Sequence, residues 1–182
     1  YKYYNNDNYA IIGIDVNHIQ CYNIDWNEKV NIDNQQEVFN LIEQVQPDFI
    51  YYLAAYHHSS EDDIKGSLNL VNNSYQINIF SYLNFLEGIR LYSNRTRIFY
   101  AASSHIYGQP VDLLQDETTK FAPQTVYAIT KLDGLLLSRY YRTNYSIMSS
   151  VGILYNHESH LRSDNFITKR IVNTAIEIKN NK

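Results

Sequence analysis

Cysteine is nearly absent from this sequence, which has Cys21 alone among its 182 residues. A single cysteine cannot form an internal disulfide, which excludes a disulfide-stapled secreted domain and suits a reducing cytoplasm. Long apolar runs are also missing, because none approaches the roughly 20 residues that cross a bilayer. The opening stretch YKYYNNDNY lacks the apolar segment of a signal peptide. We therefore expect a cytoplasmic chain with no membrane partner.

Positive charge is scarce as well, and the formal net charge is −4. Proteins that bind nucleic acids or anionic membranes usually carry a broad basic surface, so we expect no nucleic-acid partner. Metal-ligating residues are present but not grouped. The adjacent side chains of His57 and His58 diverge, and His157 and His160 have no cysteine near them in sequence. This spacing does not fit a closed metal site, and we expect no metal.

The sequence does contain enough apolar material for one core, at 45% hydrophobic and 14% aromatic residues. Short apolar runs predict strands, and apolar residues three or four positions apart predict amphipathic helices. The predicted strands are residues 9–15, 48–55, 97–103 and 146–155. The predicted helices are residues 35–46, 67–92 with a break near Asn72 and Asn73, 125–143 and 166–179.

This alternation of strands and helices predicts an α/β fold with a doubly wound parallel sheet, Rossmann-like and covered on both faces. Ligands of such sheets bind beyond the carboxyl ends of the strands. The residues that follow the predicted strands are therefore candidates for function. They are Asp15, Ala54, Ala55, Ser103, Ser104 and Asn156.

Tyr127 and Lys131 lie four residues apart on a predicted helix, which places them on one face. A nearby cation favours tyrosinate and would lower the pKa of Tyr127 from about 10 toward a range useful for proton transfer. Ser103 could hydrogen-bond the same substrate oxygen. A lone Tyr-x-x-x-Lys is weak evidence, since such a pair also occurs on solvated helix faces.

Further segments resemble the extended short-chain dehydrogenase/reductase family, and within it the GDP-mannose 4,6-dehydratase family. The similar strings are QPDFIYYLAA (46–55), QINI (76–79), LEGIR (86–90), YG (107–108), GILYNHES (152–159) and FITKR (166–170). NHES is the most discriminating of them. The similarity covers nearly the whole chain in the family's order.

The resemblance implies an NAD(P)-dependent enzyme that converts a nucleotide-linked hexose, with GDP as the nucleotide, into a 4-keto-6-deoxy sugar. It makes Tyr127 the base at the C4 hydroxyl, Ser103 the residue that orients this hydroxyl, and Lys131 the contact to the nicotinamide ribose. Cofactor contacts are assigned by resemblance to Asn31, Ile32, Leu53, Ala54 and Ala55. Substrate contacts are assigned to Ser104, Asn156, Glu158, Arg162, Thr168 and Lys169. The same resemblance makes Asn78 a structural residue.

His105 departs from the family, which carries Glu at this position as the base at C5. A neutral imidazole with a pKa of about 6.5 is a suitable base near pH 7, so dehydration can survive the change. Without elimination, Ser103, Tyr127 and Lys131 would serve an NAD-dependent 4-epimerase or a 4-reductase. A third interpretation makes His105 a hydrogen-bonded residue at a strand end.

Asp15 is predicted to end a strand where a carboxylate accepts hydrogen bonds from a ribose 2′-hydroxyl and repels a 2′-phosphate. This favours NAD, although many family members carry arginine in this loop, which is consistent with NADP. A turn or capping role for Asp15 is the alternative. Asn31 stands where relatives place an aspartate against adenine.

The sequence contains no Gly-rich turn of the kind that holds a pyrophosphate. We expect residues 1–182 to form a single partial NAD(P)-binding Rossmann domain without its first strand, in which residues from about 156 lead into a truncated substrate domain. Residues 67–92 and 125–143 are expected to pair with a second copy in a homodimer or higher homo-oligomer. A non-catalytic, partner-binding chain is the alternative from another functional class.

Overall fold

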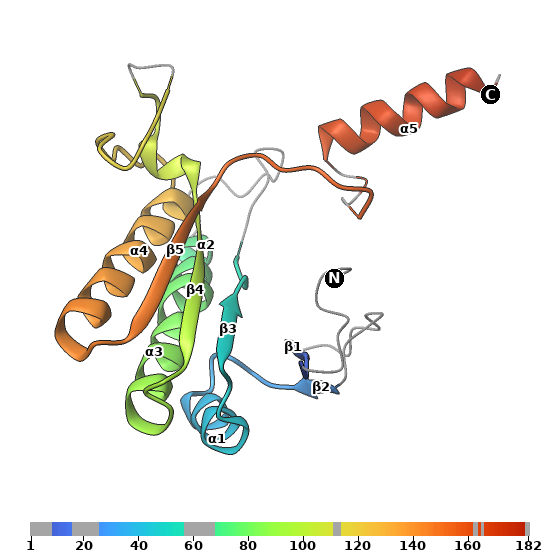
Figure 1. The fold of residues 1–182 in the computed structure, drawn as a ribbon. Coiled ribbons are helices and arrows are strands. Elements are labelled where there is room, and N and C mark those ends of the chain that lie inside the picture. Colours follow the sequence, from blue (N-terminus) through green and yellow to red (C-terminus); the bar gives the residue numbers. More distant parts are fainter. Residues whose placement is uncertain are drawn as a thin grey trace.

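The computed structural model describes residues 9–15, 26–56, 68–110, 114–161, 164 and 166–180. Two parallel sheets run through this part of the chain (Figure 1). Strands β1 (Ile12–Asp15) and β2 (Trp26–Lys29) form one of them. The second has the order β3-β4-β5 and consists of Phe49–Tyr52, Arg97–Ser103 and Met148–Leu154. Every described strand pair is parallel, as predicted for an α/β fold.

Helices connect the strands and complete the alternation. They are α1 (Gln35–Val45), α2 (Leu68–Tyr75), α3 (Ser81–Tyr92), α4 (Val126–Tyr145) and α5 (Ile167–Lys179). A π-helical turn, η1 (Gln76–Phe80), joins α2 to α3, and a 3₁₀ turn, η2 (Ser104–Tyr107), follows β4. The predicted helices and strands are all present within a few residues.

Local chemistry explains where α1 begins and ends. The Asn34 side chain accepts hydrogen bonds from the backbone N–H groups of Gln36 and Glu37, which satisfies two donors that have no partner inside the helix. The helix ends at Gln46, which has a left-handed conformation with φ of 48°, and Pro47 follows. These residues set the two ends of α1.

Two features differ from the sequence-based expectation. Strand β2 was not predicted, because its sequence WNEK has no apolar run. The expected break at Asn72 and Asn73 is wrong, since α2 continues through both residues. The irregularity is the π turn that follows, where the Ser81 N–H donates to the carbonyl of Gln76, five residues earlier.

The main core lies between the three-stranded sheet and the helices α1, α3 and α4. Tyr52 from β3 and Tyr100 from β4 pack there against Tyr82 of α3, with centroid distances of 5.0 Å for Tyr52–Tyr82 and 4.4 Å for Tyr82–Tyr100. The three phenols are buried, and the hydroxyl of Tyr82 bonds to Ser138 at 2.7 Å and to Ser149 at 3.1 Å. Aromatic packing thus fixes α3 and α4 against the sheet.

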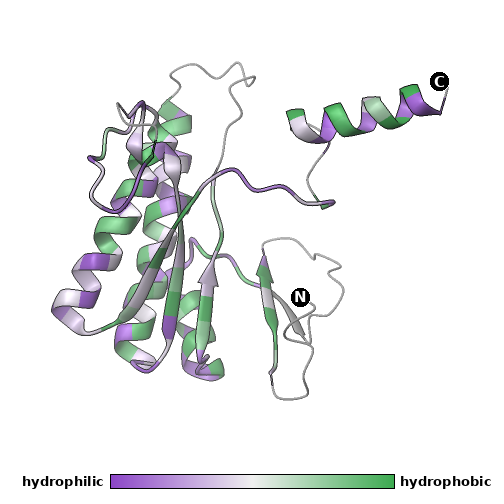
Figure 2. Cartoon of the chain, turned by 45° about the horizontal axis from the view of Figure 1, so that its top comes forward, coloured by the Kyte–Doolittle hydropathy of each residue, from purple (hydrophilic) through white to green (hydrophobic). Residues whose placement is uncertain are grey.

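Helices α3 and α4 lie on the same side of this sheet (Figure 1). On the opposite side, Phe49, Tyr51 and Leu53 alternate with inward residues and are at least half exposed. Helix α5 stands apart from the rest and has no buried residue, with apolar and polar residues alternating along it (Figure 2). Among the described helices, none is both long and apolar enough to cross a membrane.

Candidate active site

Ser103 is the last residue of β4 and caps the turn that follows it. Its side-chain oxygen accepts a hydrogen bond from the backbone N–H of His105 at 3.3 Å. This contact fixes the start of η2, and therefore the backbone of Ser104 and His105, at the carboxyl end of the central strand. The location agrees with the general position of ligand sites in parallel sheets.

Tyr127 lies in the first turn of α4. The hydroxyl of Thr125 accepts a hydrogen bond from the Ala128 N–H at 3.1 Å and so caps the helix beside it. Tyr127 hydrogen-bonds Ser103, and the edge of the His105 ring meets the Tyr127 ring at a centroid distance of 6.0 Å and an angle of 86°. The structure thus brings together three of the residues that the sequence singled out.

The protonation of Tyr127 differs from the sequence-based expectation. Burial raises the pKa of Tyr127, and the hydrogen bond from Ser103 opposes this shift only in part. The expectation of a lowered pKa is wrong for this structure, because desolvation of the partly buried phenol is the larger of the two effects. Lys131 Nζ lies 5.7 Å from the centroid of the Tyr127 ring.

Lys131 is one turn further along α4 and is only 2% exposed. Its ammonium donates a hydrogen bond to the backbone carbonyl of Ala101 at 2.8 Å. Burial lowers the pKa of Lys131 to about 8, so the amine still carries its proton at neutral pH. A cation is therefore held within the core, directly behind the phenol of Tyr127.

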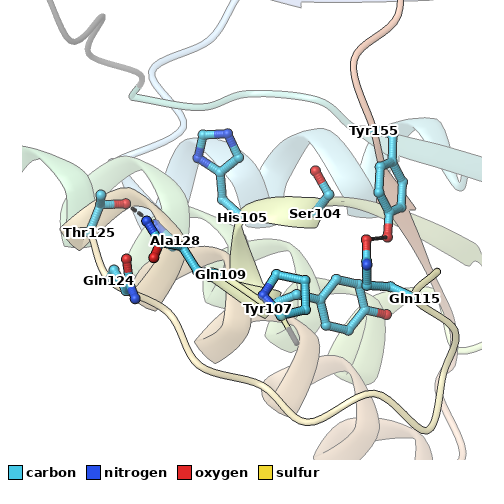
Figure 3. Close-up of a pocket in the computed structure, with 11 residues that line it drawn as sticks. Ser104, His105, Tyr107, Gln109, Gln115, Gln124, Thr125, Ala128 and Tyr155 are labelled. Carbon is cyan, nitrogen blue, oxygen red and sulfur yellow. Dashed lines mark hydrogen bonds between the residues drawn. The ribbon is translucent and has the colours of Figure 1, made fainter. Parts of the chain in front are cut away.

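A pocket of about 350 Å³ lies beside these residues, although Ser103, Tyr127 and Lys131 do not themselves line it. Ser104 and His105, which the sequence analysis predicted as site residues, are among the residues that line it. Figure 3 shows Gln115 and Tyr155 on one side, joined by a 3.1 Å hydrogen bond, and Gln124 and Thr125 on the other. The sequence analysis missed Gln115 and Gln124 because they lie in an irregular loop. Tyr155 directly precedes the predicted residue Asn156, so its position at a strand end was a usable signal.

The predicted adenosine contacts cluster at the two-stranded sheet. Asp15 ends β1, and its carbonyl accepts a hydrogen bond from Val30 N–H at 3.3 Å. Asn31 follows β2 and accepts a bond from Asp33 N–H through its side-chain oxygen at 3.1 Å. Ile32 packs against the core, and its carbonyl accepts from Asn84 at 3.0 Å. The loop is thus fixed by its own contacts and by α3.

Leu53, Ala54 and Ala55 continue from β3 at the same edge of the sheet as Ser103. The neighbouring Tyr56 N–H donates to the side chain of Asn78 at 2.8 Å, and Asn78 in turn donates to Thr130 at 2.8 Å. Asn78 is fully buried and links the loop after β3 to α4. This is a structural role, as the sequence analysis predicted.

The predicted substrate contacts after β5 are not gathered around Tyr127. Asn156 and Glu158 are exposed, and Glu158 accepts a hydrogen bond from Thr168 at 2.8 Å. Lys169 donates to the carbonyl of His160 at 3.0 Å. These bonds tie the start of α5 to the preceding loop, and α5 itself stands away from β4 and α4 (Figure 1). Arg162 lies outside the described residues.

No group of three or more His, Cys, Asp or Glu side chains in the described part of the chain could hold a metal ion. His57, His58 and Cys21 fall outside that part.

Sequence comparison adds to this geometry. The family model for GDP-mannose 4,6 dehydratase matches residues 13–182. The chain belongs to this family. A GDP-mannose 4,6-dehydratase from Sinorhizobium fredii strain HH103 is 33% identical over 150 residues, which are 81% of this chain and 41% of that protein. The GDP-mannose 4,6 dehydratase of Drosophila melanogaster is 31% identical over 81% of this chain and 37% of its own length. The chain thus spans about two-fifths of these family members.

Solved structures confirm the Rossmann-like fold. A dTDP-glucose 4,6-dehydratase from Bacillus anthracis, in complex with NAD, has a TM-score of 0.78 at 18% identity and covers 97% of this chain and 55% of its own. RMD from Pseudomonas aeruginosa, complexed with NADPH, has a TM-score of 0.74 at 20% identity and covers 86% and 53%. A UDP-glucose 4-epimerase from Brucella ovis, in complex with NAD, reaches 0.70 at 20% identity, with 85% and 51% covered.

Proposed function

We propose that this family member is a nucleotide-sugar 4,6-dehydratase that acts on a GDP-linked hexose and yields a 4-keto-6-deoxy sugar. The observation that carries the proposal is the Ser103–Tyr127 hydrogen bond at the carboxyl end of β4, with Lys131 behind it and His105 beside it. These residues lie where a parallel sheet binds its ligands, and His105 faces a pocket lined by amide and hydroxyl groups.

The described residues fit part of a nicotinamide dinucleotide. The Asp15 carboxylate at the end of β1 suits the hydroxyl groups of the adenosine ribose and favours NAD over NADP. Lys131 supplies a donor beside Tyr127 for the second ribose. The 182 residues contain no Gly-rich turn for the pyrophosphate, so this contact is not part of the fit. When bound, the nicotinamide group supplies hydride acceptance and return.

In the proposed mechanism Tyr127 accepts the proton of the sugar C4 hydroxyl, and Ser103 holds this hydroxyl by a hydrogen bond. Burial raises the pKa of Tyr127, so its phenolate needs help from a positive charge. Lys131, with a pKa of about 8, provides that charge at neutral pH. The short, buried arrangement lets the cation act without screening by water.

His105 is proposed as the base for elimination. Oxidation at C4 acidifies the C5 proton, and the imidazole removes it. The imidazolium then gives a proton to the C6 hydroxyl, which leaves as water and forms a C5–C6 double bond. The 4-keto-6-deoxy product is complete when C6 receives the hydride and C5 a proton. The ring is exposed to the pocket and lies against Tyr127, so a sugar that contacts the phenol through C4 would bring C5 toward the imidazole. An NAD-dependent 4-epimerase or 4-reductase is the second candidate, favoured by the single observation that His105 replaces the family's carboxylate.

The test is mass spectrometry of the full-length protein incubated with GDP-mannose and either NAD or NADP. We expect a product lighter by one water and a preference for NAD. His105→Ala should abolish the water loss, and His105→Glu should retain it, because either side chain can serve as the base. Tyr127→Phe should lower turnover about 10²–10⁴-fold, the usual contribution of a positioned acid or base.

Other outcomes assign the alternatives. An unchanged substrate mass with an inverted sugar configuration would make the protein a 4-epimerase. In a separate incubation of a 4-keto sugar nucleotide with NADH or NADPH, a gain of two hydrogens would make it a 4-reductase. No turnover with any sugar nucleotide would favour the non-catalytic, partner-binding role. Turnover that survives Tyr127→Phe would contradict the mechanism.

We also propose a homodimer formed through the long helices. Along α4, Ile129, Leu136 and Tyr140 are 38%, 45% and 50% exposed and lie seven and four residues apart, which places them on one helix face. Phe80 in η1 is 51% exposed. An apolar stripe of this kind on long helices is suited to pairing with a second copy.

A further inference from the structure

The buried ammonium of Lys131 faces an aromatic ring. Its nitrogen lies 5.0 Å from the centroid of Tyr100, closer than its 5.7 Å to Tyr127. Among the described residues no carboxylate pairs with Lys131, and the hydrogen bond that the structure gives its amine goes to the neutral carbonyl of Ala101. Burial of a cation without an anion is costly, so another source of negative potential is needed.

Tyr100 is held in place on three sides. Gly134, three residues after Lys131 on the same face of α4, leaves the space that the phenol occupies: a Cβ at Gly134 would lie 2.2 Å from Tyr100 Cζ and from its hydroxyl oxygen. Tyr82 packs against the ring at a centroid distance of 4.4 Å. The hydroxyl points to the carbonyl of Asn78 in the π turn, at 3.5 Å. The ring is fully buried and cannot swing away from Lys131.

We propose that Tyr100 is a positioning residue for Lys131: its ring face holds the charged amine against the Ala101 carbonyl, directly behind Tyr127. The face of an aromatic ring carries negative potential, and its attraction for a cation grows when water is excluded. The contact therefore keeps Lys131 protonated inside the core. Its importance for turnover rests on the proposed function, whereas the contact itself does not.

The groups around Tyr100 and Lys131 bear on whether the ring itself stabilises the protonated amine. Burial raises the pKa of Tyr100, so the ring stays a neutral phenol at neutral pH. The other titratable side chains around the Tyr100–Lys131 pair are Tyr52, Tyr82, Tyr127 and Asp133, and His105 lies against the far member of this group, Tyr127. Asp133 raises the pKa of Tyr100, whereas burial lowers the pKa of Lys131, and the ring face of Tyr100 opposes this loss of charge.

The test weakens the ring's negative face without changing its shape. Tyr100→Phe keeps the face, and fluorinated phenylalanines incorporated at position 100 of the intact protein, with one, two and five fluorines, reduce and finally reverse it. The protonation of Lys131 is followed by NMR of ¹³C-labelled lysine side chains, with its signal assigned through Lys131→Arg. We expect the Lys131 pKa to fall with each step, by about one unit across the series, a tenfold change in proton affinity.

The same pentafluoro substitution at Phe85 is the matched control. Phe85 is buried in the core and packs on Tyr52 at 5.4 Å, but it has no contact with Lys131. The Lys131 pKa should not move in this variant. A pKa that is constant across the series at position 100, or that falls equally with the Phe85 control, overturns the proposal.

Turnover separates this proposal from the proposed function. If the fluorinated series shifts the Lys131 pKa and also the pH profile of kcat by the same amount, the positioning role of Tyr100 and the proposed function are both supported. If the pKa shifts while no sugar nucleotide is converted by the unaltered protein, the positioning role stands and the dehydratase proposal fails.

Discussion

At the scale of single residues, the buried charge of Lys131 lowers the stability of the folded protein. Its pKa of about 8, against 10.5 for a free lysine, corresponds to about 3 kcal/mol of destabilisation at pH 7, since one unit is worth about 1.4 kcal/mol. We predict that Lys131→Met raises the free energy of unfolding at pH 7 by about 2 kcal/mol, after the loss of the bond to Ala101 is subtracted.

The pH dependence of this gain has a defined sign. The unfolded chain binds more protons than the folded one between pH 8 and 10.5, so the stability of the protein with Lys131 rises with pH over this window. The advantage of Lys131→Met should therefore shrink from pH 8 to pH 10.5. Urea unfolding at pH 7 and pH 10 measures it, and an advantage that is equal at both values would point to packing instead of charge.

The sequence predicted which residues meet but not how they titrate. Four-residue spacing on a helix was sufficient to place Tyr127 with Lys131, and the end of a strand was sufficient to place Ser103. The pKa of Tyr127 depends on how much water the folded chain removes, which spacing does not specify. The sequence analysis missed Tyr100 for a related reason. The contact of its ring with Lys131 depends on the space that Gly134 leaves for the ring in the folded chain.

At the scale of elements, the fit of β4 against α4 depends on Gly134. We predict that Gly134→Ala lowers the free energy of unfolding by about 2 kcal/mol, because overpacking against the rigid Tyr100 ring exceeds the gain in helix propensity. Gly88→Ala is the control: its Cβ would lie 2.6 Å from Ile42 Cδ1, the end of a side chain that can rotate. Gly88→Ala should change the free energy of unfolding by no more than about 1 kcal/mol. Equal losses in thermal or urea unfolding would contradict this account.

Elements with strong apolar patterns were predicted well, and the others were not. Residues 97–103 form β4 with the predicted bounds, since the run is apolar and ends at small residues. β2 pairs with β1 through its backbone, from Ile12 opposite Trp26 to Asp15 opposite Lys29, and its own sequence carries no apolar run. A strand that is held mainly by backbone pairing with its neighbour cannot be predicted from the pattern of its own side chains.

At the scale of the whole molecule, the exposed stripe on α4 predicts an oligomer. Leu136→Lys places a charge in the middle of the proposed interface and should convert the dimer to a monomer, which light scattering after size-exclusion chromatography would detect. Leu161→Lys is the control, because it adds the same charge at a leucine that is 77% exposed and lies outside the helices. It should leave the measured mass of the dimer unchanged. A monomeric unaltered protein would rule out the interface.

The fold class was predictable because alternation of strands and helices admits few topologies. The arrangement of residues after β5 was not, since α5 buries none of its side chains and the loop before it makes mainly local bonds. Thr168 and Lys169 were predicted as substrate contacts from similarity alone, and in the structure their side chains bond to Glu158 and His160.

The π turn between α2 and α3 limits how this sequence can change. Each residue advances a helix by 100°, so the extra residue accommodated in Gln76–Phe80 sets the direction in which Tyr82, Leu86 and Ile89 of α3 point. Removing one residue would make the helix regular and would rotate these core side chains away from the sheet. Exposed positions of the turn, such as Phe80, can be substituted, but the number of residues in the turn is fixed by the packing that follows.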